Sequence, residues 1–318
     1  MYKKVVVLGG GTGISFFLRG LKEFPVDITA VITVSDNGKS TGALREEFKI
    51  PAVGDIRKVV SNMSNIDEDI KKMIEYRFKT NSYLNGHALG NLIFTAMLDI
   101  TGSLEKSIAS LSKLLDVNHT ILPLSEDCLT LMGETYDGKI IEGEAEITKE
   151  HTQYKKIYYK EEPHVLDKVL KSILEADLIV LSMGSLYTSI LPHIISKQVK
   201  KAIKESKAKV MYLCNAFTQP GETDDYKVSD HVKLLNHYLG KGTIDVVIAS
   251  NTKIDEKLAL KYSTEEQKDP VRIDYDGIKE QNVELIEGDL LALNEADGSL
   301  KHNSMKLSTL VFNYLMRD

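Results

Sequence analysis

The stretch Lys4-Val5-Val6-Val7-Leu8, followed at once by Gly9-Gly10-Gly11-Thr12-Gly13, decides the fold. A short run of apolar residues is typical of a strand that is buried on both faces of a parallel sheet. The glycines predict a tight turn, and residues 14–23 behind them have the apolar spacing of a helix. A second apolar strand follows at residues 27–35. Strand, turn, helix and strand within about 30 residues predict a βαβ unit.

The same alternation returns later in the chain, where apolar strands and amphipathic helices follow one another. This pattern predicts an α/β protein with a Rossmann-like doubly wound, mostly parallel sheet. Further strands are predicted at residues 177–182, 209–214 and 244–250, and helices at residues 67–115, 165–175, 231–239 and 303–316.

One region breaks this rhythm. In residues 127–160 polar and apolar residues alternate, and Asp137-Gly138 is a strong two-residue hairpin signal. We interpret the region as an antiparallel β excursion. Because no Pro- or Ser-rich linker flanks it, we expect an inserted hairpin region within a single Rossmann-like domain covering residues 1–318.

Composition excludes several classes of function. The net charge of −6 does not favour a nucleic-acid or anionic-membrane binder, since both need a basic surface. Cys128 and Cys214 lack the spacing of a zinc site, and two thiols in 318 residues favour a reducing compartment. No signal peptide or run of about 20 apolar residues is found. We therefore expect a cytoplasmic protein, and leave open whether it forms a homodimer.

Glycine-rich loops follow two of the predicted strands. Backbone N–H groups of Gly10, Gly11, Thr12 and Gly13 could approach a phosphate, helped by the dipole of the following helix. Residues 184–188 repeat this position after another strand. Ligands of open parallel sheets bind outside the carboxyl ends of the strands, and polar, glycine-rich sequence follows all five predicted strands, so these loops should converge on one crevice. The dinucleotide fingerprint G-x-G-x-x-G is not matched, which disfavours an NAD(P)-dependent oxidoreductase, and a ligand-free turn is the alternative.

The loop at residues 35–45 carries an acid, hydroxyls and a base. Asp36 closes the second strand, where it could hold a ribose or Mg²⁺, and the alternative is a plain turn. Gly38-Lys39-Ser40-Thr41 imitates the end of a Walker A motif, but Thr33 stands where that motif needs glycine, so a P-loop NTPase is rejected.

The other candidates stand in loops after strands or before helices. Asp55 is a helix cap or a second metal ligand, and Arg57 pairs with a phosphate or with Asp55. His87 is structural or an acid–base group. Asn215 and Gln219 could contact a base or sugar. The candidate ligand-binding residues are Gly10, Gly11, Thr12, Gly13, Asp36, Asn37, Ser40, Thr41, Arg45, Asp55, Arg57, His87, Asn91, Gly184, Ser185, Tyr187, Thr188, Asn215, Gln219, Glu222, Thr223 and Asn251; the candidate metal ligands are Asp36 and Asp55, and the candidate catalytic residues are Asp36, Asp55 and His87.

Six motifs in order carry a family resemblance across nearly the whole chain. They are GGGTG (9–13), SDNGKSTGALR (35–45), VGDIRK (53–58), GHALGN (86–91), GSLYTS (184–189) and NAFTQPGETDDY (215–226). This set resembles the bacterial gluconeogenesis factor family of the YvcK type, which is related to the 2-phospho-lactate transferase CofD. The resemblance implies a Rossmann-like sheet with an inserted portion. CofD-type relatives transfer a phospholactyl group from a guanylylated donor to a deazaflavin with Mg²⁺. The gluconeogenesis factor branch is linked to cell shape and growth on gluconeogenic carbon sources, and to binding of UDP-N-acetylglucosamine-like nucleotide sugars.

The chain departs from the family at its second loop. The family commonly reads Asp-Asp-Gly-Gly-Ser-Ser-Gly there, but Asn37 replaces an acid and Lys39 a glycine. Losing one carboxylate weakens a paired-carboxylate Mg²⁺ site more than it weakens phosphate binding. We therefore expect a nucleotide-sugar-binding regulator that acts through a protein partner in cell-envelope control. The alternative is a Mg²⁺-dependent transferase in which Asp36 and Asp55 hold the metal and His87 is the base.

Overall fold

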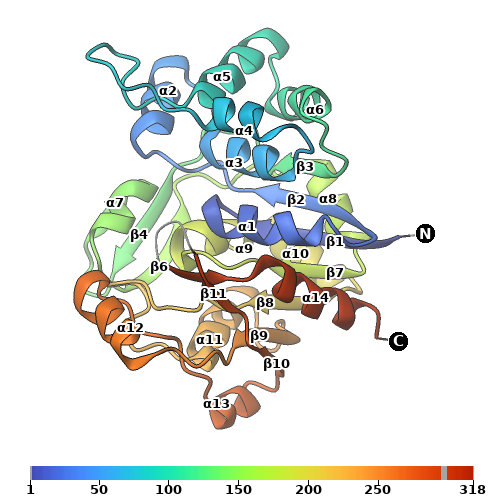
Figure 1. Ribbon diagram of the computed structural model, residues 1–318, viewed down its shortest axis with the longest axis vertical. Coiled ribbons are helices and arrows are strands. Elements are labelled where there is room, and N and C mark those ends of the chain that lie inside the picture. Colours follow the sequence, from blue (N-terminus) through green and yellow to red (C-terminus); the bar gives the residue numbers. More distant parts are fainter. Residues whose placement is uncertain (1, 295–298, 318) are drawn as a thin grey trace.

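A seven-stranded parallel sheet forms the centre of the molecule in the computed structural model, which describes residues 2–294 and 299–317 (Figure 1). The predicted α/β class and its five strands are confirmed. The strand order is β10-β9-β8-β7-β1-β2-β3. The strands are β1 (Lys3–Gly9), β2 (Val26–Ile32), β3 (Thr120–Pro123), β7 (Leu178–Leu181), β8 (Lys209–Leu213), β9 (Val246–Ser250) and β10 (Glu284–Gly288).

The direction of winding reverses between β1 and β7. From β1 the chain moves outward to β2 and β3, and it then returns to β7 and winds outward through β8, β9 and β10. β1 lies between the two halves, with Val5 opposite Ile28 on one side and Leu178 on the other. The sheet therefore has its topological switch point between β1 and β7, and ligands of open α/β sheets bind at such a point, outside the carboxyl ends of the strands.

Helices cover the sheet, and the C-terminal helix packs on the first one (Figure 1). The α1 helix contacts α3 and α14, while α10 contacts both α8 and α9, and α9 contacts α11. The helices of the first half are α1 (Gly11–Leu21), α2 (Lys39–Phe48), α3 (Gly54–Met63), α4 (Glu68–Glu75), α5 (Leu89–Thr101) and α6 (Leu104–Leu114). Those of the second half are α8 (Asp167–Leu174), α9 (Leu191–Ile194), α10 (Lys197–Glu205), α11 (Val228–Leu239), α12 (Glu256–Lys261), α13 (Tyr275–Glu280) and α14 (Ser304–Leu315), with π-helical turns η1 (Leu186–Ile190) and η2 (Tyr262–Glu266).

Two expectations need correction. The region 67–115 is not continuously helical, because residues 76–88 form a turn-rich loop between α4 and α5. Arg77 Nη1 donates to the Gly86 carbonyl oxygen at 2.9 Å inside this loop. The edge strands β3 and β10 were not predicted, because they are short and lack a continuous buried apolar run.

The predicted antiparallel insertion is present as a three-stranded sheet in the order β5-β4-β6. Gly138 takes the positive φ of +88° that the predicted hairpin turn requires. The insertion consists of β4 (Leu131–Thr135), β5 (Ile140–Glu142), α7 (Glu144–Lys149) and β6 (Tyr154–Tyr159), and a separate small pair is formed by β11 (Leu291–Leu293) and β12 (Leu300–His302). In the described part of the chain, none of the helices has the length and apolar character to cross a lipid bilayer.

Candidate functional site

A cavity of about 410 Å³ lies where the loops after β1, β7 and β8 meet. The start of α1 and the C-terminal segment around β12 both line it. Phe217 and Tyr262 stack in this cavity, with ring centroids 4.6 Å apart and planes inclined by 30°. The residues that line the cavity include Thr12, Gly13, Phe16, Met183, Gly184, Ser185, Asn215, Phe217, Gln219, Tyr262, Lys268, Leu300 and His302.

The first glycine loop is held close to its neighbours. Gly10 caps α1 without a side chain, and Gly11 has a φ of +66°. A Cβ at Gly13 would lie 2.2 Å from the carbonyl oxygen of Met183, so the backbones of two loops touch here. Beneath the loop, His193 Nε2 donates to the Gly9 carbonyl oxygen at 3.0 Å, and burial lowers the pKa of His193 to about 4. A neutral histidine thus supports the end of β1.

Asn215 holds the third loop instead of facing a ligand. Its side-chain amide accepts from the Gly184 N–H at 2.9 Å and donates to the Gly184 carbonyl oxygen at 2.8 Å. Gln219 lines the cavity, and its buried Oε1 has no hydrogen-bond partner within the described residues. Of the two predicted amide contacts to a base or sugar, Gln219 is therefore the one whose side-chain oxygen is not held by the described protein groups.

Glu222 occupies the anion position that was predicted for a phosphate. Its carboxylate accepts hydrogen bonds from the Ser185 hydroxyl at 2.7 Å, from the Leu186 N–H at 2.5 Å and from the Tyr187 N–H at 3.3 Å. Burial raises the pKa of Glu222 to about 7, against the lowering effect of these donors. The expected phosphate contact at residues 185–188 is thus filled by a side chain of the same protein.

Three carboxylates from distant segments gather beside the second loop. A Cβ on Gly10 would lie 3.2 Å from Asp55 Oδ2, and one on Gly54 would lie 3.3 Å from Asp36 Oδ2. Glu144, from α7 of the insertion, accepts from the Ser35 hydroxyl at 3.2 Å. Burial, and then repulsion by Asp36 and Asp55, raises the pKa of Glu144 well above its ordinary value. Burial also raises the pKa of Asp36, and repulsion by Asp55 adds to this.

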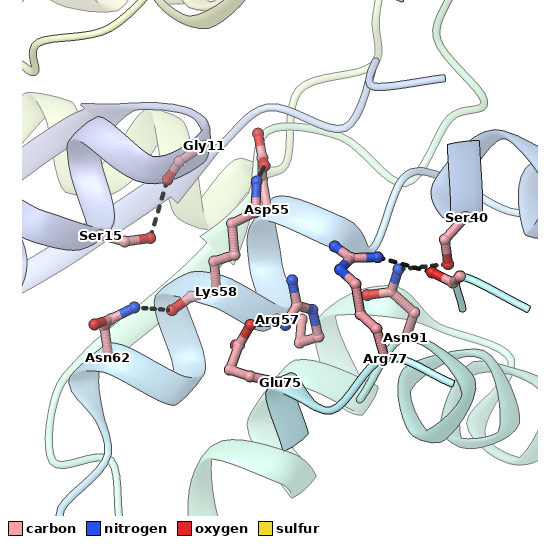
Figure 2. Close-up of polar contacts among 11 residues, drawn as sticks. Gly11, Ser15, Ser40, Asp55, Arg57, Lys58, Asn62, Glu75, Arg77 and Asn91 are labelled. Atoms are coloured by element: carbon pink, nitrogen blue, oxygen red, sulfur yellow. Dashed lines mark hydrogen bonds and ion pairs between the residues drawn. The ribbon is translucent and has the colours of Figure 1, made fainter. Parts of the chain in front are cut away.

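These carboxylates do not form a ready metal site. Asp36 Oδ1 accepts from the Gly38 N–H at 2.8 Å, and Asp55 Oδ1 pairs with Lys58 Nζ at 2.9 Å (Figure 2). Residues 2–294 and 299–317 contain no group of three or more His, Cys, Asp and Glu side chains placed to hold a metal ion.

Both candidate arginines, Arg45 and Arg57, bind groups of the protein itself. Arg45 donates to the carbonyl oxygens of Ser35, Asp36 and Leu129 at 2.6–2.9 Å. Arg57 is 1% exposed and forms an ion pair with Glu75 on α4, as Figure 2 shows. Glu75 is therefore the partner of Arg57, in place of the predicted phosphate or Asp55.

Ser40, His87 and Asn91 form a separate polar group between α2 and α5. Asn91 Nδ2 donates to Ser40 Oγ at 3.1 Å (Figure 2), and His87 Nδ1 lies 3.0 Å from the same oxygen. Since Asn91 donates to the hydroxyl oxygen, the hydroxyl proton can point to His87. None of the three lines the cavity of about 410 Å³.

The remaining candidates have local partners. Asn37 Oδ1 accepts from the Ala145 N–H at 2.8 Å, and Thr223 Oγ1 accepts from the Gln219 N–H at 2.9 Å. Tyr187 is buried and its hydroxyl accepts from the Tyr154 N–H at 3.2 Å. Thr188 is buried and donates its N–H to Ser185 Oγ, Thr41 interacts with Asp36, and Asn251 is exposed.

Several cavity residues were missed by sequence reasoning. Phe16 follows the glycine loop on α1, but Tyr262, Lys268, Leu300 and His302 come from a C-terminal region without a motif. Glu144 was missed because it lies in the insertion, more than 100 residues from Ser35. No local signal in the sequence places these residues at the crevice.

Comparison with known proteins shows the family of this chain. The family model described as 2-phospho-L-lactate transferase CofD matches residues 5–291. The gluconeogenesis factor of Bacillus subtilis (strain 168) is 38% identical over 313 residues, covering 98% of both chains, and that of Halalkalibacterium halodurans is 40% identical over 310 residues, covering 97% of this chain and 95% of the relative. A crystal structure from Bacillus halodurans matches with a TM-score of 0.94 and 39% identity, covering 98% of this chain and 100% of that one. A structure titled as a UPF0052 family member from the same organism gives a TM-score of 0.93. The chain therefore belongs to the CofD-like family and, within it, to the gluconeogenesis factors.

Proposed function

We propose that this chain binds a nucleotide sugar of the UDP-N-acetylglucosamine kind and acts as a regulator of cell shape during gluconeogenic growth. The observation that carries the proposal is the cavity at the reversal point of the sheet. It is lined by Thr12 and Gly13 of the glycine loop and by the ring pair of Phe217 and Tyr262. A nucleotide needs both features, because its phosphates seek backbone N–H groups and its base seeks an aromatic face.

The pattern of hydrogen bonds supports phosphate binding at the first loop alone. The N–H groups of Leu186 and Tyr187 already bind Glu222, whereas the start of α1 has no side-chain cap. Lys268 lines the cavity but pairs with Glu266 at 2.7 Å, and burial lowers the pKa of His302 to about 4. In this proposal the N–H groups and dipole of α1 supply most of the attraction for the diphosphate.

The proposal of a regulator is supported by the polar side chains near the predicted site, because they already form hydrogen bonds or ion pairs within the protein. Arg45, Arg57, Asn215 and Glu222 all bind groups of the protein itself. The Ser185 hydroxyl, which lines the cavity, is likewise held by Glu222. A regulator must pass its ligand state to a partner, and we include a protein partner in cell-envelope control in the proposal.

One observation favours the alternative, a Mg²⁺-dependent transferase. Asp36, Asp55 and Glu144 repel one another, and a cation beside them would relieve that repulsion. Asp36 and Asp55 are the residues that would hold Mg²⁺, but Gly38 and Lys58 already engage one oxygen of each. The present geometry does not fit the ion, so we derive no step through it.

Calorimetric titration of the purified protein with UDP-N-acetylglucosamine, with and without Mg²⁺, tests the proposal. We expect binding that is independent of Mg²⁺ and leaves the ligand intact. Phe217→Ala should weaken binding about tenfold, since one stacked base contributes about 1–3 kcal/mol. Tyr136→Phe is the matched control, because Tyr136 is exposed on the hairpin.

Titrations with GDP and NADH separate the alternatives. Binding of GDP only with Mg²⁺, or turnover of the ligand, would favour the transferase, and Asp36→Asn should then abolish it. Binding of NADH alone would favour an oxidoreductase. The absence of binding to all three ligands would refute a nucleotide site.

A further inference from the structure

One face of α10 carries a row of lysines. Lys197, Lys200, Lys201 and Lys204 are spaced i, i+3, i+4 and i+7, which places them on the same side of a helix. The other side of α10 packs into the core through Val199, Ala202 and Ile203. The helix therefore turns an uninterrupted basic face outward.

This face lines a groove of about 510 Å³ between α10 and the end of α11. Its floor is formed by Tyr238, Leu239 and Gly240, and His237 adds another basic group. Lys204 leans across the end of α11, with its Nζ 3.6 Å from the position of a Cβ on Gly240. The basic groups therefore surround a concavity.

The lysine row is costly to the helix. Like charges at i,i+3 and i,i+4 each destabilise a helix by about 0.2–0.5 kcal/mol. Other surface helices avoid this cost, since α4 pairs Lys71 with Glu68 and Lys72 with Asp69. In the groove, the described residues provide one ion pair, Lys201 with Glu205 at 3.9 Å.

The basic stretch is short and bounded by acids. Glu162 accepts from the Lys197 N–H at 2.7 Å where α10 begins, and Glu205 is its last residue. From Lys197 to Lys204 a helix rises about 10 Å, which three or four residues of an extended peptide would span. A long nucleic acid would meet the flanking carboxylates, and a flat lipid surface would not reach the floor of a groove.

We propose that this groove docks an acidic segment of a protein partner, with Asp, Glu or phosphorylated side chains facing the four lysines. The groove reaches the end of α11, which leads to the amino end of β9, whereas the nucleotide cavity lies at the carboxyl ends of the strands. Partner and nucleotide can therefore be bound together. The docking site stands or falls independently of the nucleotide proposal.

Fluorescence anisotropy with a labelled peptide of alternating Glu and Ser, in low salt, tests the proposal on the full chain. We expect saturable binding that weakens about tenfold in K197Q/K200Q/K201Q/K204Q, because glutamine keeps the helix propensity and removes the charges. The control is K72Q/K106Q/K171Q/K279Q, which removes the same charge from exposed positions on four other helices. It should change the affinity less than twofold.

Lysine acetylation followed by mass spectrometry gives a second readout that needs no variant. Bound peptide should slow acetylation of Lys197, Lys200, Lys201 and Lys204 in the wild-type protein and leave Lys72 and Lys279 unchanged. Equal loss of binding in both variants, or protection spread evenly over the surface, would overturn the proposal. So would binding of single-stranded RNA, or of phosphatidylglycerol vesicles, through this row in place of the acidic peptide.

Discussion

At Gly13 the first loop passes so close to the loop after β7 that an added Cβ would lie 2.2 Å from the Met183 carbonyl oxygen. We expect Gly13→Ala to lower the free energy of unfolding by about 2–3 kcal/mol, because backbone atoms cannot move aside as a side chain does. Urea unfolding measures this. Gly38→Ala is the control, since its Cβ meets only one flexible carboxylate oxygen at 3.2 Å. An equal loss in both variants would contradict the close approach.

Glu222 should make the stability depend on pH. Its pKa is about 7 in the folded protein and near 4.5 in the unfolded chain, so the folded state holds the proton more tightly. The contribution of Glu222 to the free energy of unfolding is therefore fully present below about pH 4.5 and is lost as the pH rises through about 7, by about 3 kcal/mol. Unfolding in urea across this range should show the slope, and Glu222→Gln should remove it. A slope that persists in the variant would assign it to another group.

The direction of these side chains could not be predicted from the sequence. Glu222, Arg57 and Asn215 lie in motifs that suit a phosphate site; Asn215 and Glu222 follow β8, and Arg57 lies in the first turns of α3. Whether such a group faces a ligand or a neighbouring backbone depends on burial and on segments far away in the chain. Glu75, for example, comes from α4 and takes Arg57 away from the loops.

Strand β6 is held to η1 and α11 by two tyrosine hydroxyls. Tyr187 accepts from the Tyr154 N–H at 3.2 Å, and Tyr238 accepts from the Ile157 N–H at 2.9 Å. We expect Y187F/Y238F to leave these N–H groups unsatisfied, at about 1–3 kcal/mol each. Hydrogen exchange should rise in residues 131–159 and remain unchanged in β1. Y136F is the control, and unchanged exchange in β6 would refute the role of these bonds.

At the level of elements, periodicity identified the buried strands and the hairpin. Central strands such as β1 have a continuous apolar run, residues 5–8 in β1, which suits a strand covered by helices on both faces. The edge strands were not predicted, because Thr120–Pro123 and Glu284–Gly288 mix polar and apolar residues. The residues of η2 and β12 that line the cavity were not predicted either, because only the folded chain brings them beside α1.

The whole chain shares one hydrophobic core that extends from Val5 to Leu315. The last helix packs on the first, where Phe24 and Phe312 lie with ring centroids 5.0 Å apart. The expectation of a single domain leads to a prediction of one cooperative unfolding transition. Because the chain has no tryptophan, Phe312→Trp would report on α14 alone. Its fluorescence midpoint in urea should coincide with that of circular dichroism, and separate midpoints would indicate two units.

The contacts between the insertion and the rest of the protein limit how segments can be exchanged between relatives. Its backbone is held by Asn37, Tyr187 and Tyr238, and a Cβ on Gly221 would lie 1.9 Å from the backbone of His151. In a hybrid that exchanges only residues 127–160 between relatives, the insertion would not match the host residues that contact it. A functional hybrid therefore needs these host positions to be transplanted together with the insert.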